Sequence, residues 1–259
     1  MAQTAAIVPS VLVAGFRTHT NDWNTVETGA TLTAGDALDM RLEGAPHMIA
    51  KYGDNKGFYG GIGLPRMGLS VATYETAGTI KLNGRFRSAL SRLIALFFGT
   101  ETTAAAGGGM YTHLFEWAAN SQYVGTFAYY ENLLCHDFPM TKVTSLEFDF
   151  EPGMIPTVTV GLFCKREYID GSAANTAGGM VVGTVTFPAQ PAILYPIFAP
   201  STCTIRLVDA SGIALASTTH DKYPSKLNVK FARKVPVIYT LRNIPYPDEP
   251  IYSDGDLTC

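Results

Sequence analysis

The chain has 259 residues, of which 47% are hydrophobic and 16% charged, with a formal net charge of −3 at pH 7. This composition argues against a disordered chain and against a nucleic-acid-binding protein with a basic footprint, and no stretch approaches the roughly 20 apolar residues of a membrane helix. The 25 glycines and 15 prolines favour one large, turn-rich, mainly β domain.

Cysteine usage indicates synthesis in a reducing compartment. Cys135, Cys164, Cys203 and Cys259 are far apart and show neither a metal-pair spacing nor the density of a disulfide framework. The N-terminus lacks the basic region that precedes the apolar run of a secretory signal. We therefore expect free thiols in a protein made in the cytoplasm.

Residues 1–68 have scattered apolar residues and little sustained periodicity, which predicts an extended N-terminal arm with a few short strands, separate from a main domain over 69–259. The Gly-rich stretch 52–68 predicts a loop. Its GGIG run at 60–63 precedes Pro65 and a strand, whereas a dinucleotide-binding loop follows a strand and opens a helix. No cofactor is therefore predicted.

The next elements are a strand from Leu69 through Arg85 and one helix. Apolar residues at i, i+3, i+4 and i+7 predict that helix, with Ser88 as N-cap and Gly99 just past its end. We interpret 102–109 as an Ala/Gly linker, followed by strands at 110–117 and 123–130. Later strands are expected at 181–187, 202–208, 227–231 and 235–241, and a loop at 170–179. The apolar stripe of the helix consists of Leu90, Leu93, Ile94 and Phe97.

The most regular pattern is a hairpin from Lys142 to Phe163. In its first arm three apolar residues alternate with Glu147, Asp149 and Glu151, and Pro152-Gly153 then breaks the run. The second arm has the same period of two, so the arms are expected to pair antiparallel with both apolar sets on one face. The three acids then face water or another subunit.

No catalytic or metal-binding set emerges from the sequence. Cys135, His136 and Asp137 are adjacent, whereas a nucleophile, a base and an orienting group normally converge from separate segments, so a loop with incidental polar residues is expected there. None of the five histidines has the spacing of a metal pair, and His113 is interpreted as a packing or interface residue. Three acids on one strand are more typical of a solvated face than of a cation site or a glycosidase pair.

Charge near the end of the chain is asymmetric. Residues 222–243 carry only basic charges and residues 244–259 only acidic ones. This pattern fits either a solvated strand with a polar tail or charges that dock across subunits, where complementarity sets register. The candidate interface residues are Lys226, Lys230, Arg233, Lys234, Asp248, Glu249, Asp254 and Asp256.

The order of these segments resembles the tail tube, or major tail, proteins of long-tailed bacteriophages. The likeness covers residues 69–210: a strand entering the helix SALSRLIALFFGT, a linker, MYTHLFEWA, YVGTFAYY, and TKVTSLEFDFEPGMIPTVTVGLF. Positions that match the paired-strand motif of the family are Val143, Ser145, Leu146, Glu151, Pro152, Gly153 and Val158 to Val160.

The resemblance implies an antiparallel β-barrel or sandwich with one flanking helix, assembling into hexameric or trimeric rings that stack into a hollow conduit for DNA ejection. It implies a place in the virion tail, with tape measure, terminator and distal tail proteins as partners and only transient passage of double-stranded DNA. A conduit must not hold phosphate through many cations, so we hypothesise that Glu147, Asp149 and Glu151 line the lumen or a ring-to-ring contact. Residues 1–68 and 165–179 are the candidates for contacts between rings.

Two rival classes stay open. One is another β-rich virion part or a secretion-tube protein, which shares the structural role. The other is a soluble β-sandwich that binds ligands, such as sugars, through its 13 tyrosines and 14 phenylalanines. An enzyme is not expected, because no nucleophile, base and orienting group can be assembled from the sequence.

Overall fold

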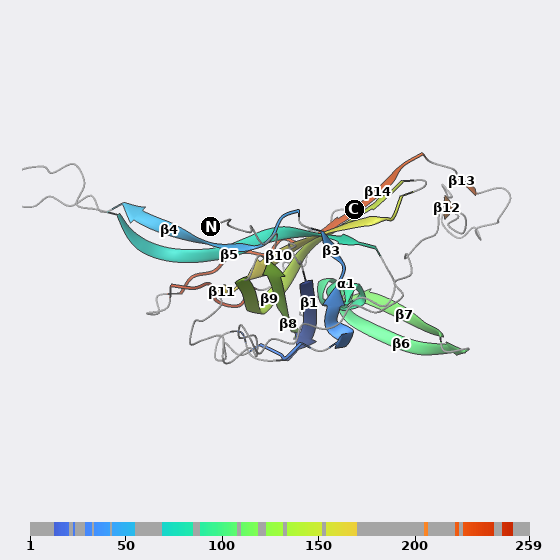
Figure 1. The fold of residues 1–259 in the computed structure, drawn as a ribbon, viewed down its shortest axis with the longest axis horizontal. Helices are drawn as coiled ribbons and strands as arrows, with labels where there is room; N and C mark the ends of the chain where they lie inside the picture. The colour runs from blue at the N-terminus through green and yellow to red at the C-terminus, as the bar shows by residue number, and fades with distance from the viewer. Residues whose placement is uncertain are drawn as a thin grey trace, which may run out of the picture.

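The computed structural model describes residues 13–20, 23, 29–32, 34–41, 43–54, 69–84, 89–107, 110–118, 123–131, 134–151, 154–169, 205–206, 221–222, 225–240 and 245–250 (Figure 1). The GGIG run, the expected strand at 181–187, the loop at 170–179 and the acids Asp254 and Asp256 lie outside these residues.

The described residues form a mainly antiparallel β structure with one short helix, as the composition and patterning predict. Ten strands make the main sheet, in the order β2-β1-β8-β9-β10-β5-β3, with β4 paired to β5, and β11 and β14 paired to β9. Among the described strands the two end strands of this path do not pair, so no closed barrel is formed. The strands of this sheet are β1 (Val13–His19), β2 (Ala37–Leu38), β3 (Met40–Arg41), β4 (His47–Asp54), β5 (Leu69–Asn83), β8 (Val124–Glu131), β9 (Leu134–Phe150), β10 (Thr157–Cys164), β11 (Tyr168–Ile169) and β14 (Leu227–Ala232).

Two further pairs of strands stand apart from the main sheet. β6 (Gly99–Gly107) pairs with β7 (Met110–Trp117), and β12 (Ile205–Arg206) pairs with β13 (Asp221–Lys222). Of the expected strand at 202–208, the structure describes residues 205 and 206, and these form β12.

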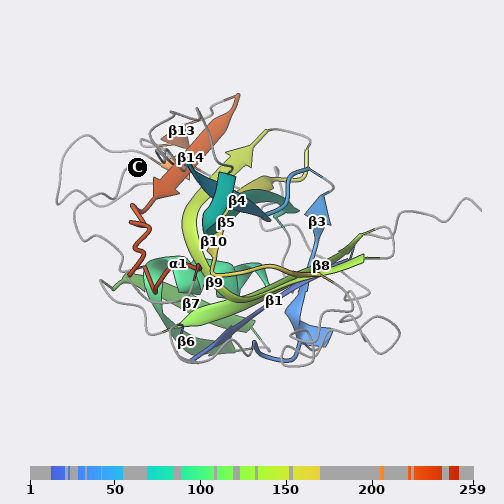
Figure 2. The ribbon, with the colours of Figure 1, turned by 90° about the vertical axis from the view of Figure 1, so that its left-hand side faces the viewer.

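Strand β9 organises the main sheet because it bonds different strands along its length. On one edge its first half pairs with β8 and its second half with β14. On the other edge it pairs with β11 and then with β10. Figure 2 shows the strong curve of β9 that makes this change of neighbours possible.

The predicted central hairpin is confirmed as the pair β9 and β10. Val158 lies opposite Phe148, and Val160 lies opposite Leu146, so the two apolar sets share one face. A register shift after Gly161 bends the ladder. A Cβ atom at Gly161 would meet the hydroxyl oxygens of Ser145 and Thr144 at 2.4 and 2.6 Å, so this bend requires glycine.

The described part of residues 1–68 belongs to the main sheet, and this corrects the expectation of a separate arm. β1 pairs with β8 over seven residues, β2 pairs with β1, and both β3 and β4 pair with β5. Phe16 and Leu38 are fully buried in the main core. The sequences of β1 (VAGFRTH) and β4 (HMIAKYGD) have no sustained alternation of apolar and polar residues, so these strands are not recognised without their partners.

The helix α1 (Leu90–Phe98) follows the predicted stripe and packs Leu93 and Phe97 into the main core beside β9 and β1. Gly99 ends the helix in the left-handed region with φ 101°, as its position predicts. The N-cap is Ala89, which offers no side-chain hydrogen bond. The predicted cap Ser88 lies outside the described residues.

Residues 102–107 are not a linker. They belong to β6, which forms a two-stranded ribbon with β7, here called the β6–β7 ribbon. Ala and Gly have weak strand propensity, and pairing with the aromatic-rich β7 overrides it. From Thr100 onward every residue of β6 is exposed.

A second ribbon consists of β4 and the first part of β5, and is here called the β4–β5 ribbon. β10 pairs with β5 only as far as Thr76, so Leu69 to Glu75 have β4 as their ladder partner on one edge. Ile49 and Tyr52 on β4 are 63% and 60% exposed. The two ribbons project in opposite directions along the longest axis of the molecule (Figure 1).

Arg233 anchors the base of the β6–β7 ribbon. Its buried guanidinium donates hydrogen bonds to the carbonyl oxygens of Phe97, at 2.7 Å, and Ala118, at 2.5 Å, which flank the ribbon. The same group lies 3.7 Å from the ring centre of Trp117. A single side chain thereby joins the end of β14, the end of the helix and both ribbon ends.

We expect Arg233→Ala to lower the free energy of unfolding by about 3 kcal/mol, because two buried carbonyls lose a charged donor. Lys234→Ala is the matched control, since the exposed neighbour changes stability by less than about 0.5 kcal/mol. Urea denaturation followed by circular dichroism measures both. Equal stability of the two variants would contradict the anchoring role.

Candidate functional site

The three predicted acids of the central hairpin face a basic strand of the same chain. Lys226 pairs with Glu151 at 2.8 Å, and Lys230 lies 3.4 Å from Glu147. Asn228 donates its amide to Glu147 and Asp149 at 2.9 and 2.6 Å. The hydrogen bond and charge of Glu151 raise the pKa of Lys226. We call this row of side chains on β9 and β14 the charge ladder.

The other charged residues that were predicted to lie at a subunit interface differ in their surroundings. Arg233 is buried, whereas Lys234 is exposed. The acidic tail finds a partner that was not predicted: Glu249 lies 3.0 Å from the buried Lys142. Asp248 uses its backbone N–H to bond the carbonyl of Ile238 at 2.9 Å. The structure contains one subunit, so docking of the basic strand on the acidic tail of another subunit stays a prediction.

Residues 245–250 form a strap that crosses several elements. The carbonyl of Pro245 accepts the backbone N–H of Tyr74 at 2.8 Å, and the carbonyl of Pro247 accepts Trp23 Nε1 at 3.1 Å. Tyr246 stacks on Tyr74, with ring centres 5.5 Å apart. The strap therefore covers the edge of β5 just beyond the end of β10.

Lys142 holds the strap from inside the fold. Its ammonium donates to the carbonyl of Tyr123 at 3.0 Å as well as contacting Glu249. Burial lowers the pKa of Lys142, and the hydrogen bond and charge of Glu249 oppose this change. The predicted hairpin began at this residue, but nothing in its spacing indicated that the side chain is buried.

A second polar cluster joins the base of the β4–β5 ribbon to β9. Glu167 accepts hydrogen bonds from His136 Nδ1 at 2.7 Å and from the Met48 backbone N–H at 2.8 Å, and His47 Nδ1 lies 3.9 Å away. Burial raises the pKa of Glu167, but the bonds from His136 and Met48 outweigh it, so the pKa is lowered overall. The His136 ring also stacks on Tyr129 at 4.6 Å.

Cys135, His136 and Asp137 lie in β9, so the expected loop at this point is wrong. Cys135 and Asp137 are buried on one face of the strand, and His136 points to the other. Such alternation separates adjacent side chains and prevents them from acting as a catalytic set. Sequence analysis missed Glu167, whose partners come from β4 and β9, distant in sequence.

Asp137 is the most unusual titratable group. Both carboxylate oxygens are buried and have no hydrogen-bond partner by strict geometry. Burial raises its pKa to about 7, and the nearby backbone N–H of Phe138 moderates the rise. This carboxyl group is therefore protonated in slightly acidic solution.

The described cysteines match the prediction of free thiols. Cys135 and Cys164 are buried and not bonded to each other. Burial raises the pKa of Cys164 to about 12, and the hydroxyl of Thr141 bonds its sulfur at 3.4 Å. A thiol with so high a pKa is a poor nucleophile.

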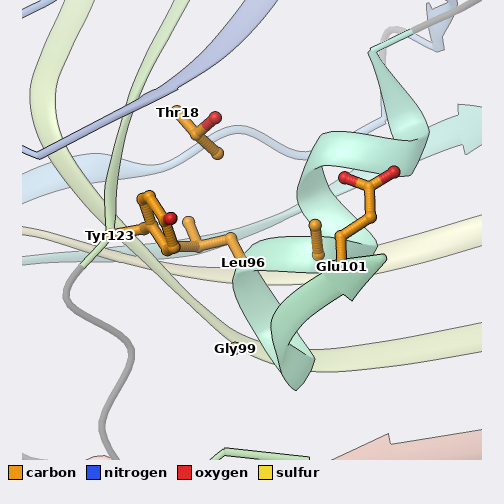
Figure 3. Close-up of a pocket in the computed structure, with 6 residues that line it drawn as sticks. Thr18, Leu96, Gly99, Glu101 and Tyr123 are labelled. Atoms are coloured by element: carbon orange, nitrogen blue, oxygen red, sulfur yellow. The ribbon is translucent and has the colours of Figure 1, made fainter. Parts of the chain in front are cut away.

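A hollow of about 240 Å³ lies at the base of the β6–β7 ribbon. Figure 3 shows the ring of Tyr123, the side chain of Leu96 and the carboxylate of Glu101 around it. Glu101 also binds His113 Nδ1 at 2.6 Å, which fixes the exposed histidine on the ribbon. Among the described residues of the lining, Glu101 is the one acid, and no second group there completes a catalytic pair with it. The lining consists of Thr18, Ala95, Leu96, Gly99, Glu101 and Tyr123.

Within the described residues, no group of three or more His, Cys, Asp or Glu side chains has the geometry to hold a metal ion. In the same residues no helix is long and apolar enough to cross a bilayer. No protein-family model matches this chain, and no curated protein matches it significantly.

We expect Asp137→Asn to stabilise the protein by an amount that grows between about pH 4 and pH 7. The carboxyl group has its ordinary pKa of 3.8 in the unfolded chain, whereas burial raises this pKa to about 7 in the folded chain. The wild type therefore loses about 1.4 kcal/mol per pH unit in this window, and the asparagine variant does not.

Urea titrations of both proteins at pH 4.5, 5.5, 6.5 and 7.5 measure this difference. Differences that stay constant across the four pH values would show that Asp137 is already ionised in the folded chain. Above about pH 7 the difference is expected to level off, since both states are then ionised.

Proposed function

We propose that this chain is a structural subunit of the tail tube of a long-tailed bacteriophage, which assembles with copies of itself into stacked rings. The proposal includes a barrel or sandwich of the tail tube type, completed in the assembled ring. The observation that carries it is the pair of opposed two-stranded ribbons, which expose large apolar side chains and which the other described residues cover only at their bases.

Isolated two-stranded ribbons are marginally stable in water, because few residues bury their apolar surface. The β6–β7 ribbon nevertheless extends nine residues along β6. Tyr111 and Leu114 of this ribbon are 63% and 54% exposed. Free ladder edges next to exposed apolar side chains favour pairing with another chain. In the proposed assembly, neighbouring copies cover these edges and apolar side chains.

The paired-strand motif that resembles tail tube proteins lies in the main sheet. The motif residues Val143, Ser145 and Leu146 lie on β9, and Val158 to Val160 lie on β10. Val143, Leu146, Val158 and Val160 are buried in the main core, which supports the structural interpretation of the motif.

The charge ladder supports a refined form of the lumen hypothesis. Its three acids are accompanied by Lys226 and Lys230 at ion-pair distances. Such a surface has nearly balanced charge and offers phosphate few unpaired cations. We retain the lumen or a ring-to-ring contact as its place in the assembly.

We expect purified protein to form rings or tubes as its concentration rises, with particle masses near three or six subunits per ring. Negative-stain microscopy and native mass spectrometry measure shape and mass. Raising the salt concentration weakens contacts between exposed charges and should leave contacts between apolar ribbon surfaces largely intact.

A protein that stays monomeric at all accessible concentrations would contradict this function. It would favour the ligand-binding β-sandwich instead. Stacked rings of larger or irregular number would favour another virion or secretion-tube component.

A further inference from the structure

Residues 234–240 form no ladder with any strand that the structure describes. The sequence predicted a strand at 235–241, and the structure contradicts this prediction over 235–240. Val237 and Ile238 are 36% and 39% exposed. A β-prone apolar segment that pairs with no described strand is available for pairing with the strand edge of another chain.

One edge of this segment is already used. Pro236 has no N–H, and the carbonyl of Ile238 accepts the backbone N–H of Asp248 from the strap. In an extended chain these alternate residues share an edge. Val235 and Val237 share the opposite edge, and their backbone groups make no hydrogen bond within the described part of the chain. This arrangement suits an edge strand, where proline turns away from the ladder.

The β6–β7 ribbon has the matching free edge. Within the described residues, β7 is the only ladder partner of β6. Residues 102–107 contain no charge and no proline, the features that usually protect an edge strand from pairing. Small Thr and Ala side chains also let another backbone approach closely.

Charges on the two surfaces are complementary. Residues 99–117 contain Glu101 and Glu116 but no Lys or Arg, whereas residues 225–240 contain four cations and no acid. Lys226 and Lys230 are occupied by the charge ladder. Among the described residues, neither Glu116 nor Lys234 has an ion-pair partner, so these two are available to each other.

The segment cannot reach the ribbon of its own chain without breaking observed contacts. Arg233 fixes its start at the base of that ribbon, and the Tyr239 hydroxyl donates to the carbonyl of Tyr74, at the base of the opposite ribbon. The segment is thus drawn away from β6. The segment of a second copy can reach the free edge of β6 while these contacts stay in place. Such a contact joins two different surfaces of the subunit, so its repetition produces a ring or a filament.

We propose that residues 234–240 of one copy add as a third strand to the β6–β7 ribbon of the next copy, with Lys234 facing the acidic ribbon. This inference rests on the proposed function, because it names the surfaces through which the subunits assemble. Strand addition supplies backbone hydrogen bonds, and the charges set the register.

Charge exchange tests the contact. We expect Glu116→Lys and Lys234→Glu, each alone, to raise the concentration needed for half-maximal assembly about tenfold, because like charges then face each other. The double variant Glu116→Lys/Lys234→Glu restores assembly, since every contact between copies then joins opposite charges again, whatever the number of subunits in the ring. Sedimentation measures assembly, and circular dichroism shows that each variant is folded. Thr79→Lys, at an exposed position on β5, is the matched control for an added charge.

Cross-linking measures proximity separately from charge. Copies carrying Thr103→Cys are mixed with copies carrying Val237→Cys, in a background with Cys203→Ser and Cys259→Ser. We expect a disulfide-linked heterodimer during assembly. Thr103→Cys mixed with Thr79→Cys is the control and should give none.

Any of three outcomes would overturn the inference alone: single charge variants that assemble like the wild type, a folded double charge variant that does not recover assembly, or cysteine variants that assemble without forming the disulfide-linked heterodimer. In each case, assembly of the wild type leaves the proposed function intact. A wild type that never assembles would remove the proposed function together with this contact.

Discussion

The ladder of β9 is the constraint on which the rest of the structure depends. Four strands bond to this one, and its two halves have different neighbours on each edge. A strand of 17 residues that serves two sets of partners must bend, and the bend encloses the core beside α1. The same curvature places β14 where Lys226 and Lys230 meet the acids of the hairpin.

In this arrangement β5 and β6 extend further than the hydrophobic core. β5 runs beyond β10, and β6 runs beyond the helix, so both continue as ribbons with a single partner strand. Buried polar side chains hold the ribbon bases: Arg233 at β6–β7, and Glu167 with His136 at β4–β5. Charged groups suit this task, because their hydrogen bonds reach backbone atoms that no neighbouring strand satisfies.

Sequence reasoning succeeded where the signal was local. The alternation of apolar residues in the central hairpin and the spacing of apolar residues along α1 identified these elements, because each pattern repeats within a few residues. It failed where a distant partner decides the outcome. β6 became a strand because β7 lies beside it, and β1 because β8 does. The burial of Lys142, Asp137 and Glu167 depends on elements far apart in the chain, so no spacing revealed it.

The failure at 235–240 differs in kind from the others. In β1 and β6, pairing with a distant strand produced a strand that the local sequence did not predict. At 235–240 the local sequence predicts a strand, but no described strand pairs with this segment. Natural sequences tend to agree across levels, so such a conflict points to a missing contact. The free edge of β6 is the reverse case, a formed strand with room for a neighbour. Each feature is unexplained alone, and both are accounted for when subunits are joined head to tail.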